Sequence, residues 1–192
     1  MATLKRESHI TLIDKLYPEA YLLKDIVFVT AGAALTAGLA QVTIPTYPVP
    51  FTLQPLGVLL AGLLLGSKRG AVSQLAYLVA GTCGLPIFAA GRTGLPVGPT
   101  AGYLYGFILV AWLMGFLAEK QWDRKPLKTA AALVIGNLVM LCAGASWLSM
   151  FVGGIIPAFK LGIAPFLLTN GLQSLAAVVL LPGAWGLLRK FE

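Results

Sequence analysis

A single arginine, Arg92, lies in a stretch rich in glycine and proline between two long apolar segments. The planar guanidinium group of arginine binds a carboxylate or a phosphate through two parallel hydrogen bonds. We therefore interpret Arg92 as a binding residue for a small anion, although an exposed loop arginine without a ligand is the simpler alternative. Lys160 is similarly isolated in the sequence, and we interpret it as an exposed loop residue.

Uncharged amides accompany this arginine inside the apolar segments. An amide in hydrocarbon needs a hydrogen-bond partner, which packing between helices would provide without any ligand. Asn170 and Gln173 are three residues apart and therefore share one face of a helix, while Gln54 stands near the end of another segment. With aromatic neighbours, these amides would suit a ligand that has a polar head and a carboxylate tail. The aromatic candidates are Phe51, Phe88, Tyr103 and Trp147.

The residue patterns of common enzymes and metal sites are missing from the sequence. It contains no P-loop, nucleophile elbow, HExxH or CxxC motif. The apolar segments hold no acid, lysine or histidine that could act as a base or relay protons. His9 has no metal-binding neighbour, and we expect Cys83 and Cys142 to be small core residues. We therefore predict a binding component without catalytic activity, metal or cofactor, which borrows energy from a partner.

The composition predicts an integral membrane protein. The chain of 192 residues fits one domain, and it is 58% hydrophobic and only 11% charged, against a usual charged share of about 25%. A helix needs about 20 consecutive apolar residues to cross a bilayer core of about 30 Å. Charged residues are absent from five long stretches, 26–67, 70–91, 93–118, 129–159 and 161–188.

Glycine, proline and charged residues divide the apolar sequence into six predicted transmembrane helices. They cover about 25–44, 53–65, 71–84, 100–118, 129–152 and 163–188. We predict a tight basic turn at Gly66–Gly70, a non-helical connection over 153–161, and a kinked or frayed helix end at Pro182. We assign residues 25–192 to the membrane domain and residues 1–24 to a cytoplasmic segment, either an interfacial helix or a loose tail.

The basic residues assign an orientation to these spans. Six spans put both termini on one side, and cytoplasmic termini leave only Arg92 and Lys160 outside among the 14 Lys and Arg residues. All seven acidic residues then also lie inside. This distribution follows the positive-inside rule, so the net charge of +7 reflects topology rather than a nucleic-acid partner. It also predicts that an anionic ligand arrives from outside.

Small residues recur along the first predicted span at a spacing that allows close helix contact in a membrane. Ala33 and Ala37 are four residues apart, and so are Ala34 and Gly38. This face either packs inside the protein's own bundle or docks a partner helix. The two uses are compatible because the small face is almost continuous.

Several motifs resemble the BioY family, the biotin-binding S components of energy-coupling factor (ECF) transporters. Their order and spacing make the resemblance specific, and it covers about residues 31–177. It rests on Pro50-Phe51-Thr52-Leu53-Gln54, Leu64-Leu65-Gly66-Ser67-Lys68-Arg69-Gly70, Tyr77, Gly84-Leu85-Pro86-Ile87-Phe88, Gly98-Pro99-Thr100-Ala101-Gly102-Tyr103, Gly144-Ala145-Ser146-Trp147-Leu148 and Gly162-Ile163-Ala164-Pro165-Phe166.

The resemblance implies an all-α, six-helix S-component bundle in the bacterial cell (inner) membrane that captures biotin from the outer side. It also implies an ECF transmembrane coupling subunit that docks at Ala33 and Ala37, and two cytoplasmic ATPases that drive transport. Arg92 would pair with the carboxylate of biotin, and Asn170, Gln173 and Gln54 would meet its polar head. The apolar part would contact Phe51, Phe88, Tyr103 and Trp147.

The last span departs from the family pattern. Family members usually carry a Gly-Asp pair there and a lysine three residues after the aspartate, and these charges are expected to help bind biotin. The corresponding residues are Thr169, Asn170 and Gln173. The chain therefore binds biotin through amides or takes a related carboxylated cargo. A structural membrane protein without a small ligand is the alternative from another functional class.

Overall fold

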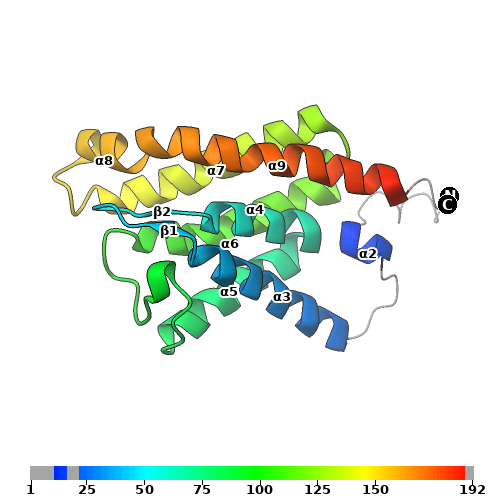
Figure 1. Cartoon of the computed structure of the whole chain (residues 1–192), viewed down its shortest axis with the longest axis horizontal. Coiled ribbons are helices and arrows are strands. Elements are labelled where there is room, and N and C mark those ends of the chain that lie inside the picture. Colours follow the sequence, from blue (N-terminus) through cyan, green and yellow to red (C-terminus); the bar gives the residue numbers. More distant parts are fainter. Residues whose placement is uncertain (1–10, 17–21, 189–192) are drawn as a thin grey trace.

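The computed structural model describes residues 11–16 and 22–188 as a bundle of helices with one short pair of strands (Figure 1). The helices are α2 (Leu12–Leu16), α3 (Leu22–Ala40), α4 (Gln54–Leu65), α5 (Ser67–Thr82), α6 (Ala101–Glu119), α7 (Pro126–Leu148), α8 (Ile155–Gly162) and α9 (Ala164–Leu188). Two 3-10 turns, η2 (Ala89–Gly91) and η3 (Trp122–Arg124), and two strands, β1 (Thr43–Ile44) and β2 (Phe51–Thr52), complete the described elements.

Helix α6 forms the centre of the bundle, where it packs against α4, α5 and α7. Its Val110, Ala111 and Met114 side chains have no exposed surface. Glycines allow neighbouring backbones to approach closely, as small residues do between membrane helices. A Cβ atom on Gly62 would overlap Ala111, and one on Gly115 would overlap the backbone at Gly66. These close contacts hold α4 and the start of α5 against α6.

The first long helix ends earlier than the sequence pattern predicts. We expected a helix to Ile44, but α3 ends at Ala40 and the chain then forms β1. Thr43 pairs with Thr52 and Ile44 with Phe51 in an antiparallel hairpin. The prolines that follow are compatible with a turn rather than with further helix. The hairpin brings residues 46–50 back over the end of the bundle.

Other helix boundaries also differ from the predictions. The predicted basic turn is reduced to Gly66, whose φ of 86° is accessible to glycine, and α5 already begins at Ser67. The predicted connection over 153–161 instead contains α8, after two glycines with positive φ. Helix α9 does end where predicted, at Leu188, with Pro182 inside it. Neighbouring interactions can compensate for the missing N–H in a membrane helix.

Four candidate membrane spans are long and apolar enough to cross a bilayer, and one of them joins α8 to α9. They cover Leu22–Ala40, Ala101–Glu119, Pro126–Leu148 and Ile155–Gly183. Helices α4 and α5 are shorter, with 12 and 16 residues, so the six-span count and the orientation stay predictions. Of the predicted N-terminal segment, only residues 11–16 and 22–24 fall within the described residues. Cys83 and Cys142 are exposed, so the expectation that they fill the core is wrong.

Candidate ligand-binding pocket

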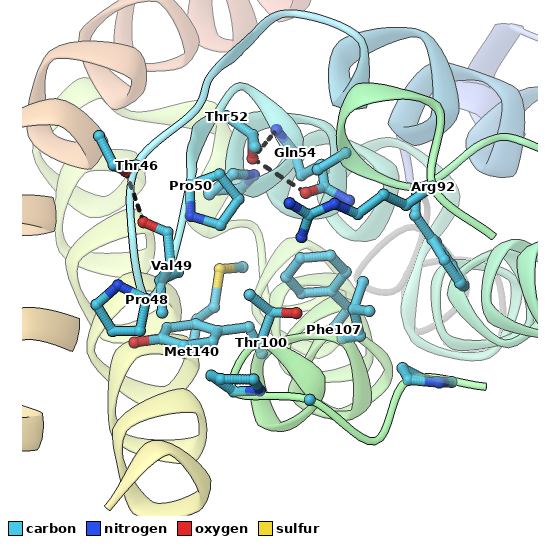
Figure 2. Close-up of a pocket in the computed structure, with 18 of the residues that line it drawn as sticks. Thr46, Pro48, Val49, Pro50, Thr52, Gln54, Arg92, Thr100, Phe107 and Met140 are labelled. Carbon is cyan, nitrogen blue, oxygen red and sulfur yellow. Dashed lines mark hydrogen bonds between the residues drawn. The ribbon is translucent and has the colours of Figure 1, made fainter. Parts of the chain in front are cut away.

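A cavity of about 360 Å³ opens at the end of the bundle that carries β1 and β2 (Figure 2). Its walls come from the hairpin turn, from the segment between α5 and α6, and from α4, α6, α7 and α9. Small-molecule pockets usually enclose about 300–1,000 Å³. The cavity is therefore large enough for a ligand of vitamin size.

Arg92 is the only charged residue in this lining among the residues that the structure describes. A tight turn precedes it, with Ala90 and Gly91 at φ values of 56° and 70°. The Phe88 N–H donates to the Arg92 carbonyl oxygen across this turn at 3.0 Å. The Arg92 side chain points from the turn toward Gln54 and Phe107 (Figure 2). The site therefore presents a positive group beside an apolar ring, as a carboxylate ligand with an apolar body would require.

Asn170 supplies the second polar feature of the wall. Its side chain is only 3% exposed, yet neither its amide nitrogen nor its amide oxygen has a hydrogen-bond partner. Most buried polar side chains are hydrogen-bonded, because an unpaired buried group costs about 1–3 kcal/mol. Asn170 therefore brings to this wall an amide donor and an amide acceptor that the protein itself leaves unpaired.

Five of the eight predicted ligand-binding residues line the cavity. They are Gln54, Phe88, Arg92, Tyr103 and Asn170. These residues are far apart in the sequence, and the folding of the bundle brings them to one cavity. Whether they bind the ligand stays a prediction.

The other three predicted residues lie behind the wall and contact residues that form it. The Phe51 ring packs on Phe166, with ring centroids 4.6 Å apart. The Trp147 Nε1–H donates to the Gly98 carbonyl oxygen at 3.1 Å. The Gln173 Nε2–H donates to the Thr52 carbonyl oxygen at 3.1 Å. In this structure the three residues support the pocket rather than line it.

Sequence reasoning missed several residues of the lining. Thr52 and Thr100 occur inside the family-like motifs, so their hydroxyl groups could have been proposed from the sequence. The Thr52 hydroxyl donates to Gln54 Oε1 at 3.1 Å. Met140 and Phe107 also face the cavity (Figure 2). No local signal distinguishes them from ordinary core residues, and only the packing of α6 and α7 shows their position.

The stripe of small residues on α3 has two sides. Ala33 and Ala37, the predicted docking residues, are partly buried against the protein's own core. Ala34 and Gly38 have the same spacing and are exposed. The stripe therefore contributes to internal packing on one side and remains open on the other, and its role in docking stays a prediction.

Comparisons with known proteins agree on one family. The family model described as "BioY family" matches residues 7–190. "Probable biotin transporter BioY" of Pyrococcus horikoshii is 36% identical over 159 residues, which cover 82% of this chain and 93% of the relative. "Biotin transporter BioY" of Thermotoga maritima is 40% identical over 133 residues, which cover 66% of this chain and 75% of the relative.

The fold has a counterpart among solved structures. It is similar, with a TM-score of 0.73 and 25% sequence identity, to the 2.1 Å crystal structure of the S-component for biotin from an ECF-type ABC transporter. The similarity covers 88% of this chain and 92% of that chain. It confirms the predicted helical S-component bundle.

Proposed function

Because the chain belongs to the BioY family, we propose that it is the substrate-binding subunit of an ECF-type vitamin transporter and that its cargo is biotin. It is a multi-pass protein of the bacterial inner membrane and not an enzyme. The observation that carries the proposal is the cavity with Arg92 and the unpartnered Asn170 in its wall. Biotin has two polar ends. Its carboxylate would pair with Arg92, and its neutral head, which both donates and accepts hydrogen bonds, would pair with Asn170.

The polar head of biotin is a cyclic urea, which has N–H donors and a carbonyl acceptor. Asn170 can satisfy both kinds of group, since its amide has one nitrogen and one oxygen without partners. The apolar ring and chain of biotin would contact Phe88, Tyr103 and Phe166, which line the same cavity. This chain would thus recognise the head through neutral hydrogen bonds in place of the charged pair that the family pattern leads us to expect.

The transport partners follow from the family. We propose that an ECF transmembrane coupling subunit docks on α3 at the stripe that contains Ala33 and Ala37, and that two cytoplasmic ATPases supply the energy. The open side of the stripe supports this proposal, because Ala34 and Gly38 leave room for a second helix.

The test is binding of biotin to the purified protein in detergent, measured by titration calorimetry. We expect tight binding by the wild type. Arg92→Ala should weaken biotin binding about tenfold to hundredfold, because a hydrogen bond to a charged group contributes about 1.5–3 kcal/mol. Binding of biotinamide, which lacks the carboxylate, should change much less.

If Arg92→Ala weakened the binding of biotin and biotinamide equally, Arg92 would not be the residue that binds the carboxylate. A folded wild-type protein that does not bind biotin would overturn the assignment of the cargo. The same titration with other carboxylated vitamins then tests the alternative cargo. A protein whose thermal unfolding responds to none of them would be a structural membrane protein.

A further inference from the structure

The segment that carries Phe88 and Arg92, residues 85–94 (the Arg92 loop), begins with the Leu85 N–H, which donates to the Ala80 carbonyl oxygen of α5 at 3.1 Å. Two further sets of hydrogen bonds attach it to the bundle. At its far end, the Gly81 carbonyl oxygen accepts the Thr93 hydroxyl at 2.8 Å and the Gly94 N–H at 2.9 Å. At its near end, the backbone carbonyl oxygens of Ile87 and Phe88 accept hydrogen bonds from side chains of neighbouring segments. The position of Arg92 depends on these attachments, because η2 is only three residues long.

Tyr77 on α5 makes the central contact at the near end. Its side chain is 1% exposed and does not line the cavity. Its hydroxyl donates to the Ile87 carbonyl oxygen at 3.1 Å and accepts the Gln54 Nε2–H at 2.6 Å. Its ring meets the Phe88 ring edge-on, with centroids 5.4 Å apart. One buried side chain therefore connects the Arg92 loop to a polar residue of the cavity wall.

The other side-chain contact at the near end is weaker. Gln41, just beyond α3, donates to the Ile87 and Phe88 carbonyl oxygens at 3.4 Å each. Its side chain is exposed, so water can replace these bonds. The buried hydroxyl of Tyr77 has no such replacement, since its removal leaves the Gln54 N–H without this acceptor in a buried site.

We propose that Tyr77 is a positioning residue for ligand binding: it holds the Arg92 loop against the cavity and orients the Gln54 amide. The effect on binding rests on the proposed function, which supplies the ligand. The effect on the loop does not depend on any ligand. Gln54 directs its nitrogen to Tyr77 and its oxygen to the Thr52 hydroxyl. Loss of the Tyr77 hydroxyl removes one buried contact from the loop and one from this amide, although the ring still packs on Phe88.

The first test is independent of any ligand. Trypsin cleaves after arginine, and Arg92 is exposed in the loop, so the rate of cleavage at Arg92, followed by mass spectrometry on folded protein, reports the mobility of the loop. Tyr77→Phe should raise this rate at least about threefold. The control is Ser73→Ala, one turn earlier on α5, which removes another buried hydroxyl that bonds to the Gly70 carbonyl oxygen. It should cleave at the wild-type rate.

The second test measures the affinities of the same variants for biotin and biotinamide. Tyr77→Phe should weaken biotin binding about tenfold. Biotinamide binding should weaken only about threefold or less, because both ligands lose the oriented Gln54 amide whereas the displaced Arg92 matters only for the carboxylate. Ser73→Ala should change neither affinity. Unchanged cleavage in Tyr77→Phe overturns the proposal, and so does an equal loss of the two affinities. If the wild type binds no biotin, the cargo assignment fails, and the cleavage rates alone decide whether Tyr77 holds the loop.

Discussion

The two ends of the bundle differ in how their charged groups are paired. At the end that carries α2 and the α6–α7 connection (the charged end; Figure 1), each acidic residue of the described chain has a partner. Asp14 and Asp25 pair with Arg69, Glu119 accepts from Ser67, and Asp123 accepts from Trp185. At the pocket end, no described acid pairs with Arg92, and Asn170 has no side-chain partner.

We interpret this difference as a separation between charges that hold the fold and groups that are available to a ligand. Arg69 Nη1 lies 2.6 Å from Asp14 Oδ1, and Arg69 Nε lies 2.7 Å from Asp25 Oδ1, so one guanidinium links α2, α3 and α5. The guanidinium of Arg92 has no such carboxylate within the described chain. Buried polar groups are normally satisfied, but unpaired atoms also occur away from the pocket, at Gln74 Oε1, Asp123 Oδ1 and Asn137 Oδ1. The support for our proposal is therefore that the unpaired Asn170 coincides with the cavity.

The largest effect should come from Asn170→Leu, which preserves most of the side-chain size. We expect biotin affinity to fall about hundredfold, because two hydrogen bonds to the head are lost. The ligand-free unfolding temperature should stay unchanged or rise, because an unpartnered polar group is removed from a buried site. Calorimetric titration and thermal unfolding in detergent measure the two quantities.

The matched control is Asn137→Leu. Asn137 is also a buried asparagine, but its Nδ2–H donates to the Leu133 carbonyl oxygen at 2.8 Å and to Ser174 Oγ at 3.0 Å, and it does not line the pocket. It should lower the unfolding temperature and leave biotin affinity within about twofold. If Asn170→Leu destabilised the protein and still bound biotin, the contrast between the two ends would be wrong.

At the charged end we expect a smaller effect, on the stability of the fold and not on biotin affinity. Arg69→Ala removes both ion pairs and should lower the free energy of unfolding by about 1–2 kcal/mol, since the groups are partly exposed and screened by water. Biotin affinity should not change. Lys68→Ala removes the neighbouring exposed positive charge and serves as the control in the same denaturation experiment. A loss of biotin affinity comparable to that of Asn170→Leu would show that the two ends are not independent.

The smallest effect concerns pH. Burial raises the pKa of the Asp123 carboxyl above its ordinary value of 3.8, and the hydrogen bond from Trp185 only partly opposes this shift. The folded state therefore binds the proton more tightly than the unfolded state, and this contribution to stability is lost as the pH rises from about 4 toward the raised pKa. The Asp123→Asn variant keeps an oxygen that accepts the Trp185 hydrogen bond. Because its amide does not titrate, its stability does not decrease with pH for this reason.

The stability of Asp123→Asn relative to wild type should therefore increase with pH. Denaturant unfolding at pH 4, 5, 6 and 7 measures it. A constant difference between the two proteins across this series would contradict the raised pKa.

The sequence predicted the class of the protein, its family and most of its long helices. These properties follow from one-dimensional patterns, because hydrocarbon excludes charge and the bilayer thickness sets a minimum helix length. The isolation of Arg92 was also visible, since a single charge in a long neutral stretch needs no structure to be noticed. The ends of the helices were less predictable. Thr43 and Ile44 extend an apolar run and would continue α3, but they pair with β2 instead.

Only the tertiary structure decided which residues meet. Asn170 and Gln173 share a helix face in the sequence pattern, yet one lines the cavity and the other supports Thr52 from behind. Tyr77 looked like part of a family motif, and its link between Gln54 and the Arg92 loop depends on the packing of α4 beside α5. Whether a residue lines the pocket depends on how side chains from several helices pack together. This packing depends on close contacts that glycines such as Gly102 and Gly144 permit, against Trp147 and Tyr103, and no local pattern records those contacts.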